Sequence, residues 1–518
     1  MKSARHTHRW DWPVLLILAV GTALRFLALG QQSLWHDEIR SVTIALGGPE
    51  NNILWAVLNI HGPLYLVLLK GWMALVGTGE GATRALSAAL GAAGLALFYR
   101  VGLPLVGRRA AMIGLSLLAV SPFYLWYSQE VRNYILLFDL GLLAIYAFLA
   151  DVREKTRGTF LAAIGTSVAV CLANLTGFFL LVFHCVYVLA FRRKVHYPFR
   201  RLLLLLVVVM VALSPWILQA TESMGQLHLG RPDEAAGEGV AIKGECPPGL
   251  LSIPFTFYSF SLGFSMGPSI DELKIHRWPA VISYLWYLVP IMMLFAFAFL
   301  WGFHRARRSA DEFRVLLLWV TIPVLLMVAL SMLNLKAPNP RYAALAFAPY
   351  LLLIGIGIAS IGNRTLRALV LIALLFFSAH ADYRYFTNAR YWRPDTRAAG
   401  KLLRQEVRPG DEAAVYTLVE PVHYYVGDAV TLRNPKPRDF ASRERMTDWL
   451  HTNVGDQRRL WIVQCMGWWL DPEDRFVHLC QEIMIPKGEW DFPKAPVYLF
   501  EVPQDWGTQN YKGERPKP

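Results

Sequence analysis

The feature that most constrains this chain is a series of apolar runs, each about as long as a membrane-spanning helix. A helix needs about 20 apolar residues to cross a bilayer, and the first 380 residues contain many such runs. Only 17% of the residues are charged, whereas a soluble domain is charged at about a quarter of its positions. We therefore expect an integral membrane protein in which a helical bundle crosses the lipid bilayer repeatedly.

The apolar runs predict an all-α polytopic bundle of about 11 transmembrane helices. The first run follows a basic N-terminus, which would also suit a signal peptide, but no small-residue cleavage site favours removal. The expected spans are 13–30, 84–105, 110–127, 133–150, 159–175, 177–191, 202–219, 279–302, 315–333, 342–361 and 365–381.

The basic residues support this topology. Every second loop between the expected spans is basic, as the positive-inside rule requires of cytoplasmic loops. We therefore read the net charge of +13 as a sign of membrane topology and not of nucleic-acid binding, for which the sequence has no motif. The basic loop residues are Arg100, Arg108, Arg109, Arg153, Lys155, Arg157, Arg192, Arg193, Lys194, Arg200, Arg201, Arg305, Arg307, Arg308, Arg314, Arg364 and Arg367.

The charge pattern divides the chain into residues 1–381, a transmembrane domain, and 382–518, a domain on the outer side. Within the first, residues 31–83 form a long outer loop whose apolar stretches, Ile53–Ile60 and Pro63–Val76, are expected to lie at the membrane surface or dip into it. A span at Leu64–Val76 is the alternative, but it would invert every later loop and spoil the charge pattern. The expected location is the cytoplasmic (inner) membrane.

The last 137 residues have the texture of a small soluble α/β domain. Apolar runs of strand length alternate there with amphipathic stretches. The expected strands are Ala413–Leu418, Arg459–Val463 and Pro496–Phe500, and the expected helices are Asp395–Glu406 and Arg443–Thr452. The five cysteines lack metal-ligand spacing; Cys465 and Cys480 could form a disulfide on the outer side or remain free.

Polar clusters interrupt the apolar pattern at the outer ends of the expected spans. Asp37 and Glu38 directly follow the first span, where an aspartate can take a proton from an acceptor hydroxyl. The same pair would also suit a solvated charged turn at a helix start. His61, on an otherwise apolar surface, can bind phosphate, carry a proton or ligate a metal, or simply lie among lipid headgroups.

Further charges gather at the same face of the bundle. Glu130 and Arg132 occupy a very short outer loop, and Arg84 stands at the outer end of the second span. Charged groups at membrane depth are costly, so they usually have a partner or a function. Lys336 and Arg341 break the positive-inside trend in another outer loop, where they could hold a phosphate or snorkel to headgroups. Together these clusters predict one site at the outer face.

In order along the chain, these clusters resemble the motifs of GT-C glycosyltransferases, in particular the protein-mannosyltransferase and aminoarabinose-transferase relatives. The resemblance covers roughly residues 10–380. The matching elements are Trp35-x-Asp37-Glu38-x-x-Ser41, His61-Gly62-Pro63-Leu64-Tyr65, Gly79-Glu80 with Arg84-Ala85 and Ser87, Ser128-Gln129-Glu130-x-Arg132-x-Tyr134, and Pro340-Arg341-Tyr342.

The resemblance implies an inverting transfer of a sugar from a polyprenyl-phosphate donor to a glycan, glycolipid or protein acceptor at the outer face. It makes Asp37 the general base or a residue that positions the acceptor, with Glu38 and Glu130 completing the acidic site. The residues implied to hold the donor phosphate are His61, Arg84, Arg132, Lys336 and Arg341. Further candidates for contact with the substrates are Tyr65, Tyr134 and Tyr342.

The sequence departs from the family pattern at two places. Gly62 stands where the relatives have the first proline of a His-Pro-Pro element, which predicts a looser turn. The loop Ala173–Gly177 lacks the His-Tyr pair that many relatives carry there. The cofactor is left open, since divalent metal dependence varies across this fold.

Other functions compete with the transferase interpretation. A lipid or sugar transporter or flippase would explain the many spans, but transporters tend to place charges at the bilayer midplane and to contain inverted repeats. A ligase of similar architecture that uses a diphosphate-linked glycan is another candidate. A sensor or scaffold would leave the ordered set of polar clusters unexplained.

Overall fold

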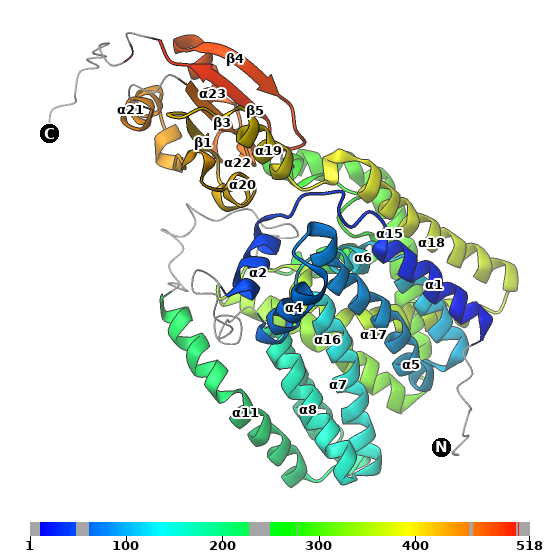
Figure 1. The fold of residues 1–518 in the computed structure, drawn as a ribbon. Helices are drawn as coiled ribbons and strands as arrows, with labels where there is room; N and C mark the ends of the chain where they lie inside the picture. The colour runs from blue at the N-terminus through cyan, green and yellow to red at the C-terminus, as the bar shows by residue number, and fades with distance from the viewer. Residues whose placement is uncertain are drawn as a thin grey trace.

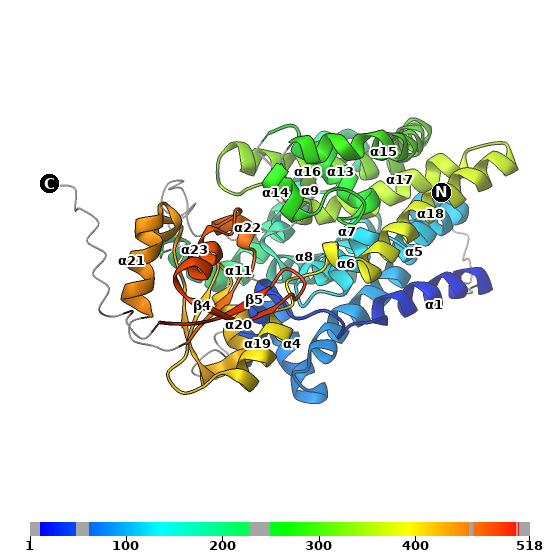
Figure 2. The same ribbon diagram turned by 90° about the horizontal axis from the view of Figure 1, so that it is seen from above.

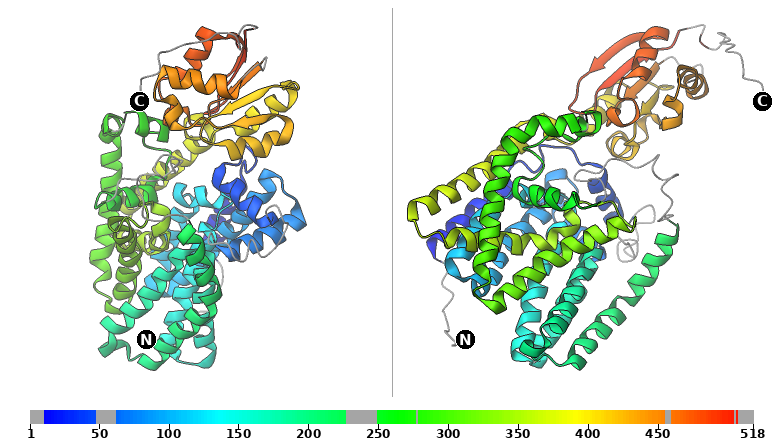
Figure 3. Two further views of the ribbon diagram at one scale, coloured as in Figure 1. Left: turned by 90° about the vertical axis from the view of Figure 1, so that its left-hand side faces the viewer. Right: turned by 180° about the vertical axis from the view of Figure 1, so that it is seen from behind.

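The chain forms a helical bundle with a small sheet domain at one end, as the sequence predicts (Figure 1). The computed structural model describes residues 11–47, 62–226, 249–276, 278–454, 459–503 and 506. Seen from above and from two further sides, the sheet domain lies over the end of the bundle that also carries α2 (His36–Leu46) (Figures 2 and 3).

Within the described residues, seven helical segments are long and apolar enough to cross a membrane. They are α5 (Glu80–Ala119), α7 (Tyr134–Glu154), α11 (Phe199–Gln226), α15 (Trp278–Ala306), α16 (Ala310–Met332), the 3-10 turn η3 (Pro340–Ala346) with α17 (Phe347–Ala359), and α18 (Arg364–Thr387). The shorter apolar helices are α1 (Trp12–Phe26), α4 (Pro63–Val76), α8 (Arg157–Ala173) and η2 (Leu175–Gly177) with α9 (Phe178–Ala190).

The remaining helices among the described residues of the bundle are short. They are α2, α6 (Pro122–Ser128), α10 (Arg192–Val195), α13 (Ser252–Leu262), α14 (Ile270–His276) and η4 (Ala389–Tyr391). The two spans expected at 84–105 and 110–127 are joined as the two halves of α5, with a non-helical Gly107 (φ 76°) between them. The second half ends at Ala119, and α6 follows with Ser121 as its N-cap, so the apolar run is bent and not straight.

The last span of the bundle leads directly into the sheet domain. The sequence places the domain boundary after residue 381, whereas α18 continues through that position to Thr387. The polar residues at the end of α18 are therefore part of the same helix as the apolar run, and they approach the end of the bundle that carries α2 (Figure 1).

The turn before α4 is tighter than the sequence suggests. Gly62 has φ +93°, in the left-handed region, and a Cβ placed there would collide with the Ala173 carbonyl oxygen and the Asn133 side chain. Proline cannot adopt this conformation because its ring fixes φ near −65°. The expectation of a looser turn is thus wrong: Gly62 lets α4 approach the end of α8 closely. Ile53–Ile60, the other stretch expected at the membrane surface, lies outside the described residues.

Gly62→Ala is expected to destabilise the protein by about 1–3 kcal/mol because of the positive φ and the missing space. Gly71→Ala is the matched control: no atom lies within 4 Å of a Cβ at Gly71, and alanine favours a helix. Reversible unfolding in lipid bicelles compares the two variants. Equal stability of both would contradict this account of the turn.

The sheet domain contains one mixed, five-stranded sheet in the order β2-β1-β3-β5-β4. β1 pairs in parallel with β2 and β3, whereas β5 pairs antiparallel with β3 and β4. The strands are β1 (Glu412–Val415), β2 (Thr431–Arg433), β3 (Arg459–Val463), β4 (Ile485–Trp490) and β5 (Val497–Glu501). The α/β fold class predicted for this part of the chain is confirmed.

Helices cover this sheet and produce two separate apolar clusters. The helices are α19 (Thr396–Glu406), α20 (Val419–Val426), α21 (Arg443–Asn453), α22 (Gly467–Leu470) and α23 (Arg475–Ile483), with 3-10 turns η5 (Gly427–Ala429) and η6 (Pro437–Phe440). Cys465 and Cys480 are buried in different clusters, and both are free thiols. The disulfide considered from the sequence is therefore not formed.

Candidate active site

The acidic pair Asp37-Glu38 lies in the first turn of α2, beneath the sheet domain. Acidic residues favour this place because the helix dipole is positive at the N-terminus. The Glu38 carboxylate also accepts a hydrogen bond from the Trp35 backbone N–H at 3.3 Å, which closes the first turn. The two carboxylates then point into different surroundings, so adjacent residues acquire different properties.

Asp37 faces two arginines from other parts of the bundle. Its Oδ2 lies 3.3 Å from Arg341 Nη1 and 4.0 Å from Arg132 Nε, and 17% of its side chain is exposed. Burial alone would raise the pKa of Asp37, but Arg132 and Arg341 outweigh it and lower the pKa to about 2. The structure thus brings together three of the predicted site residues, and Asp37 is not a solvated turn residue.

Glu38 is completely buried and is tied to two other arginines. Its oxygens accept hydrogen bonds from Arg84 at 2.7 and 2.9 Å and from Arg393 Nη1 at 2.5 Å, and Oε1 accepts the Val131 N–H at 3.0 Å. Burial would raise the pKa of Glu38, but Arg393 and Arg84 lower it. The Glu38 carboxylate is thus enclosed by its own hydrogen-bond partners and connects the start of α2 to Arg84, Val131 and Arg393.

Arg84 also has a structural role. Its five N–H donors are all used: those not bonded to Glu38 reach the carbonyl oxygens of Leu29 at 2.8 Å, Gln32 at 2.6 Å and Ser33 at 2.9 Å. No donor is left for a phosphate, so the sequence-based role for Arg84 needs correction. Arg84 holds the segment that leads into α2.

Glu130 is the third carboxylate of the site, in the turn between α6 and α7. It is buried, its Oε1 accepts a hydrogen bond from Trp35 Nε1 at 3.0 Å, and its Oε2 has no hydrogen-bond partner among the described residues. Burial raises the pKa of Glu130 to about 7; Arg393 opposes this shift, while Glu38 and Asp37 add to it. Glu130 can therefore exchange a proton near neutral pH.

Aromatic side chains surround the arginines on the Asp37 side. The Arg341 guanidinium lies 5.3 Å from the Tyr134 ring centroid and 5.2 Å from that of Tyr342, and it also donates to the Tyr342 hydroxyl at 3.2 Å. Lys336 is exposed and lies 5.8 Å from the Tyr342 ring, so it belongs to the rim. Tyr65 is buried, and its hydroxyl bonds to Ser87 Oγ at 2.8 Å, which indicates a packing role.

The remaining predicted ligand, His61, lies outside the described residues. Among the residues that are described, no group of three or more His, Cys, Asp or Glu side chains could hold a metal ion.

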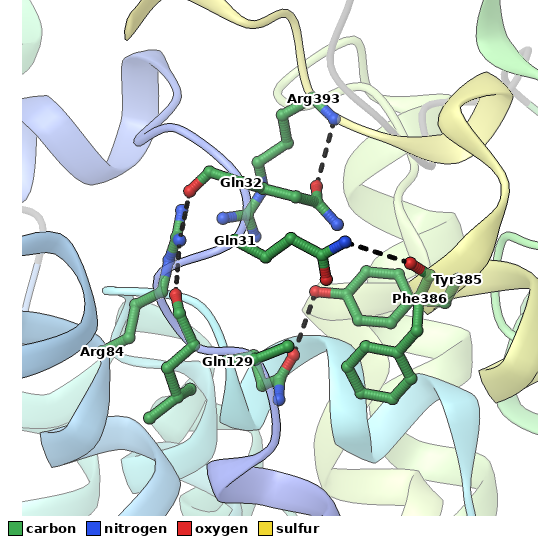
Figure 4. Close-up of a pocket in the computed structure, with 9 residues that line it drawn as sticks. Gln31, Gln32, Arg84, Gln129, Tyr385, Phe386 and Arg393 are labelled. Atoms are coloured by element: carbon green, nitrogen blue, oxygen red, sulfur yellow. Dashed lines mark hydrogen bonds between the residues drawn. The ribbon is translucent and has the colours of Figure 1, made fainter.

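The structure adds residues that the sequence did not point to, and Arg393 is the most important of them. It lies between η4 and α19, beyond the bundle, yet it reaches Glu38 across 355 positions of the chain. Beside it is a small polar pocket (Figure 4). The pocket is lined by Ala28, Leu29, Gln31, Gln32, Arg84, Gln129, Tyr385, Phe386 and Arg393. In the sequence, Arg393 is one of several arginines that follow the last expected span, and no motif distinguishes it from the others.

Comparison with known families matches part of the chain. Residues 60–218 match the family model described as dolichyl-phosphate-mannose-protein mannosyltransferase. This segment runs from α4 to α11 and includes Arg84, Glu130 and Arg132. No curated protein matches the sequence closely enough to count as a relative.

Solved structures are similar over almost the whole chain. ArnT from Cupriavidus metallidurans bound to undecaprenyl phosphate has a TM-score of 0.58 at 14% identity, with 94% of this chain and 97% of that chain covered. AglB from Archaeoglobus fulgidus, an archaeal oligosaccharyltransferase, has a TM-score of 0.53 at 12% identity, with 94% and 74% covered. Arabinofuranosyltransferase AftD from mycobacteria has a TM-score of 0.50 at 15% identity, with 95% and 40% covered. This chain is thus a multi-pass membrane protein with the GT-C glycosyltransferase fold, the one its motifs resemble.

Proposed function

We propose that this protein is a membrane glycosyltransferase that moves a sugar from a polyprenyl-phosphate donor to an acceptor hydroxyl. The observation that carries the proposal is the position of Asp37, a partly exposed carboxylate between Arg132 and Arg341. A base and two cations in one place provide what the reaction needs: a proton acceptor for the incoming hydroxyl and positive charge for the departing phosphate.

Arg132 and Arg341 are free enough to bind a phosphate, in contrast to Arg84. Their contacts with Asp37 are long, at 4.0 and 3.3 Å, and the Nε of each has no hydrogen-bond partner among the described residues. Guanidinium groups favour phosphate because they offer two parallel N–H donors. We infer that the phosphate of the bound sugar donor accepts hydrogen bonds from Arg132 and Arg341 and so replaces Asp37 as their partner.

This competition would control the basicity of Asp37. While the arginines face the carboxylate, its pKa of about 2 makes it a poor base at neutral pH. A phosphate that neutralises them would let the pKa of Asp37 rise towards the value that burial favours. Proton transfer would then be efficient only after the donor has bound.

The proposed step inverts the sugar. The acceptor oxygen forms a bond to the anomeric carbon while the bond between that carbon and the phosphate oxygen breaks. The acceptor proton moves to Asp37, and the electron pair of the broken bond leaves with the polyprenyl phosphate, whose charge Arg132 and Arg341 stabilise. Glu38 positions α2, and Glu130 provides a second carboxyl, buried close to it, that can exchange a proton.

The charges of the bundle favour the outer face of the cytoplasmic membrane as the place of reaction. The acidic site lies beneath the sheet domain, whereas the basic turn between α7 and α8, with Arg153, Lys155 and Arg157, lies at the opposite end (Figure 1). Basic turns favour the cytoplasmic side. The donor is proposed by analogy with ArnT, whose structure contains undecaprenyl phosphate; the acceptor is a glycan, glycolipid or protein.

The test is a donor panel with the purified protein in lipid nanodiscs. Polyprenyl-phosphate hexoses and pentoses are each incubated with lipid, glycan and peptide acceptors, and release of polyprenyl phosphate is measured. Release that requires both the protein and an acceptor is the expected result. Tight binding of these donors without any release would contradict the transferase and favour a transporter.

A further inference from the structure

The segment that leaves the bundle crosses directly over the candidate active site. Between η4 and α19, the Arg393 backbone N–H donates to Gln32 Oε1 at 3.2 Å (Figure 4). The Arg393 guanidinium pairs with Glu38. The guanidinium also stacks over the Trp126 ring, with its Cζ 5.0 Å from the centroid. Only 6% of Arg393 is exposed, so this charge belongs to the interior of the site.

Arg393 has more hydrogen-bonding capacity than Glu38 uses. Its Nε and Nη2 are buried and have no hydrogen-bond partner among the described residues, and the same holds for Glu130 Oε2. Leaving such groups unpaired costs free energy, so a small movement of the side chains or a change in the protonation of Glu130 is expected to alter the contacts here. Of the charges near Glu130, Arg393 acts on it most strongly.

We propose that Arg393 is a positioning residue of the active site: it ties Glu38 to the segment that leads into the sheet domain, and its positive charge offsets the negative charge of Glu130 nearby. This inference rests on the function proposed above, because it assigns a role within that same site. Arg393 touches no reacting atom; it acts through the two carboxylates. Without Arg393, Glu38 would still pair with Arg84. Glu130 would be near the negative charges of Glu38 and Asp37 with less positive charge to offset them.

The sheet domain holds this arrangement in place through several further contacts. Arg397 of α19 donates to the carbonyl oxygens of Gly30 and Gln31 and pairs with Glu80, which also accepts a hydrogen bond from Tyr425 of α20. On the same side, the Tyr425 hydroxyl accepts the Leu34 N–H at 2.8 Å.

These contacts fix residues 30–34, the segment that leads into α2 and Asp37. His36, the neighbour of Asp37, adds a 3.1 Å contact to Glu420 of α20. The domain is thereby part of the site's construction and not only a cover above it.

The experiment titrates Glu130 in the full-length protein by infrared spectroscopy, in nanodiscs and without any donor. The carboxyl band that Glu130→Gln removes identifies the residue. We expect a midpoint near pH 7 in the wild type and an upward shift of about one unit or more in Arg393→Gln and Arg393→Met, because loss of a nearby cation disfavours the carboxylate. Methionine preserves the apolar contact with Trp126 and so serves as the second neutral variant.

Two further variants separate charge from structure. Arg390→Gln removes an arginine from the same segment that pairs with Glu272 and not with the acidic site, and its midpoint should remain at the wild-type value. Arg393→Lys keeps the positive charge on a shorter side chain and should raise the Glu130 midpoint by less than the neutral variants do. If the neutral variants do not fold, the midpoint of the lysine variant tests the proposal. A wild-type midpoint in the folded Arg393 variants would overturn the proposal. Since the titration needs no turnover, its outcome is independent of the donor panel.

Discussion

Asp37→Asn is expected to slow sugar transfer by about 10²- to 10⁴-fold, the usual contribution of a general base. Asparagine has nearly the same shape but cannot accept the proton of the acceptor hydroxyl. Binding of polyprenyl phosphate should persist or become tighter, because the variant removes a negative charge that competes for Arg132 and Arg341. Turnover and binding measured in the same nanodisc preparation give both quantities.

Asp311→Asn is the matched control for this substitution. Asp311 also pairs with an arginine, Arg314, at 2.6 Å, but its side chain is 85% exposed and belongs to α16, far along the chain from α2. We expect its activity to equal that of the wild type. A folded Asp37→Asn protein with full activity would contradict the role of Asp37 as the base.

Glu38→Ala is expected to lower the free energy of unfolding by about 3–5 kcal/mol, since breaking a buried ion pair leaves its partners uncompensated. Here the loss would leave two buried guanidinium groups, those of Arg84 and Arg393, without their carboxylate. The segment that carries Asp37 would lose its anchor at the same time, so activity should fall together with stability. Reversible denaturation in lipid bicelles measures the change.

The control for this prediction is an ion pair of the sheet domain. Glu412→Gln breaks the pair with Arg433, whose side chain is 43% exposed. Exposed pairs contribute roughly 0–1 kcal/mol because water replaces the lost partner. If Glu38→Ala were as stable as Glu412→Gln, Glu38 would not be the anchor that the structure indicates, and a direct catalytic role would return to consideration.

The regular parts of the fold could be predicted from periodicity alone. α19 and α21 begin and end within about a residue of the expected helices, and β1, β3 and β5 lie where short apolar runs predict strands. β2 and β4 were missed because they are edge strands: β2 has three residues, and β4 contains Pro486 and Gly488 and is mostly exposed. Such strands carry little hydrophobic signal.

The location of the candidate site could be predicted from the sequence, but the different contacts made by its individual residues could not. Charges at membrane depth indicate a site wherever they fall on one face of a bundle, and this places Asp37, Glu130 and Arg341 together. Whether an arginine binds a substrate or a neighbouring carboxylate depends on contacts between distant segments. Arg84 and Arg341 look alike in sequence, yet all donors of the first are bonded, whereas Nε of the second has no hydrogen-bond partner within the described part of the chain. Arg393 follows no periodic pattern.

One measurement tests most directly whether Asp37 and the donor phosphate share Arg132 and Arg341: the affinity of a short-chain polyprenyl phosphate for three forms of the protein in nanodiscs. Relative to the wild type, we predict weaker binding by about 10- to 100-fold for Arg341→Gln, which loses charged hydrogen bonds, and equal or tighter binding for Asp37→Asn. Unchanged affinity in Arg341→Gln, or binding lost in Asp37→Asn, would contradict the proposed site.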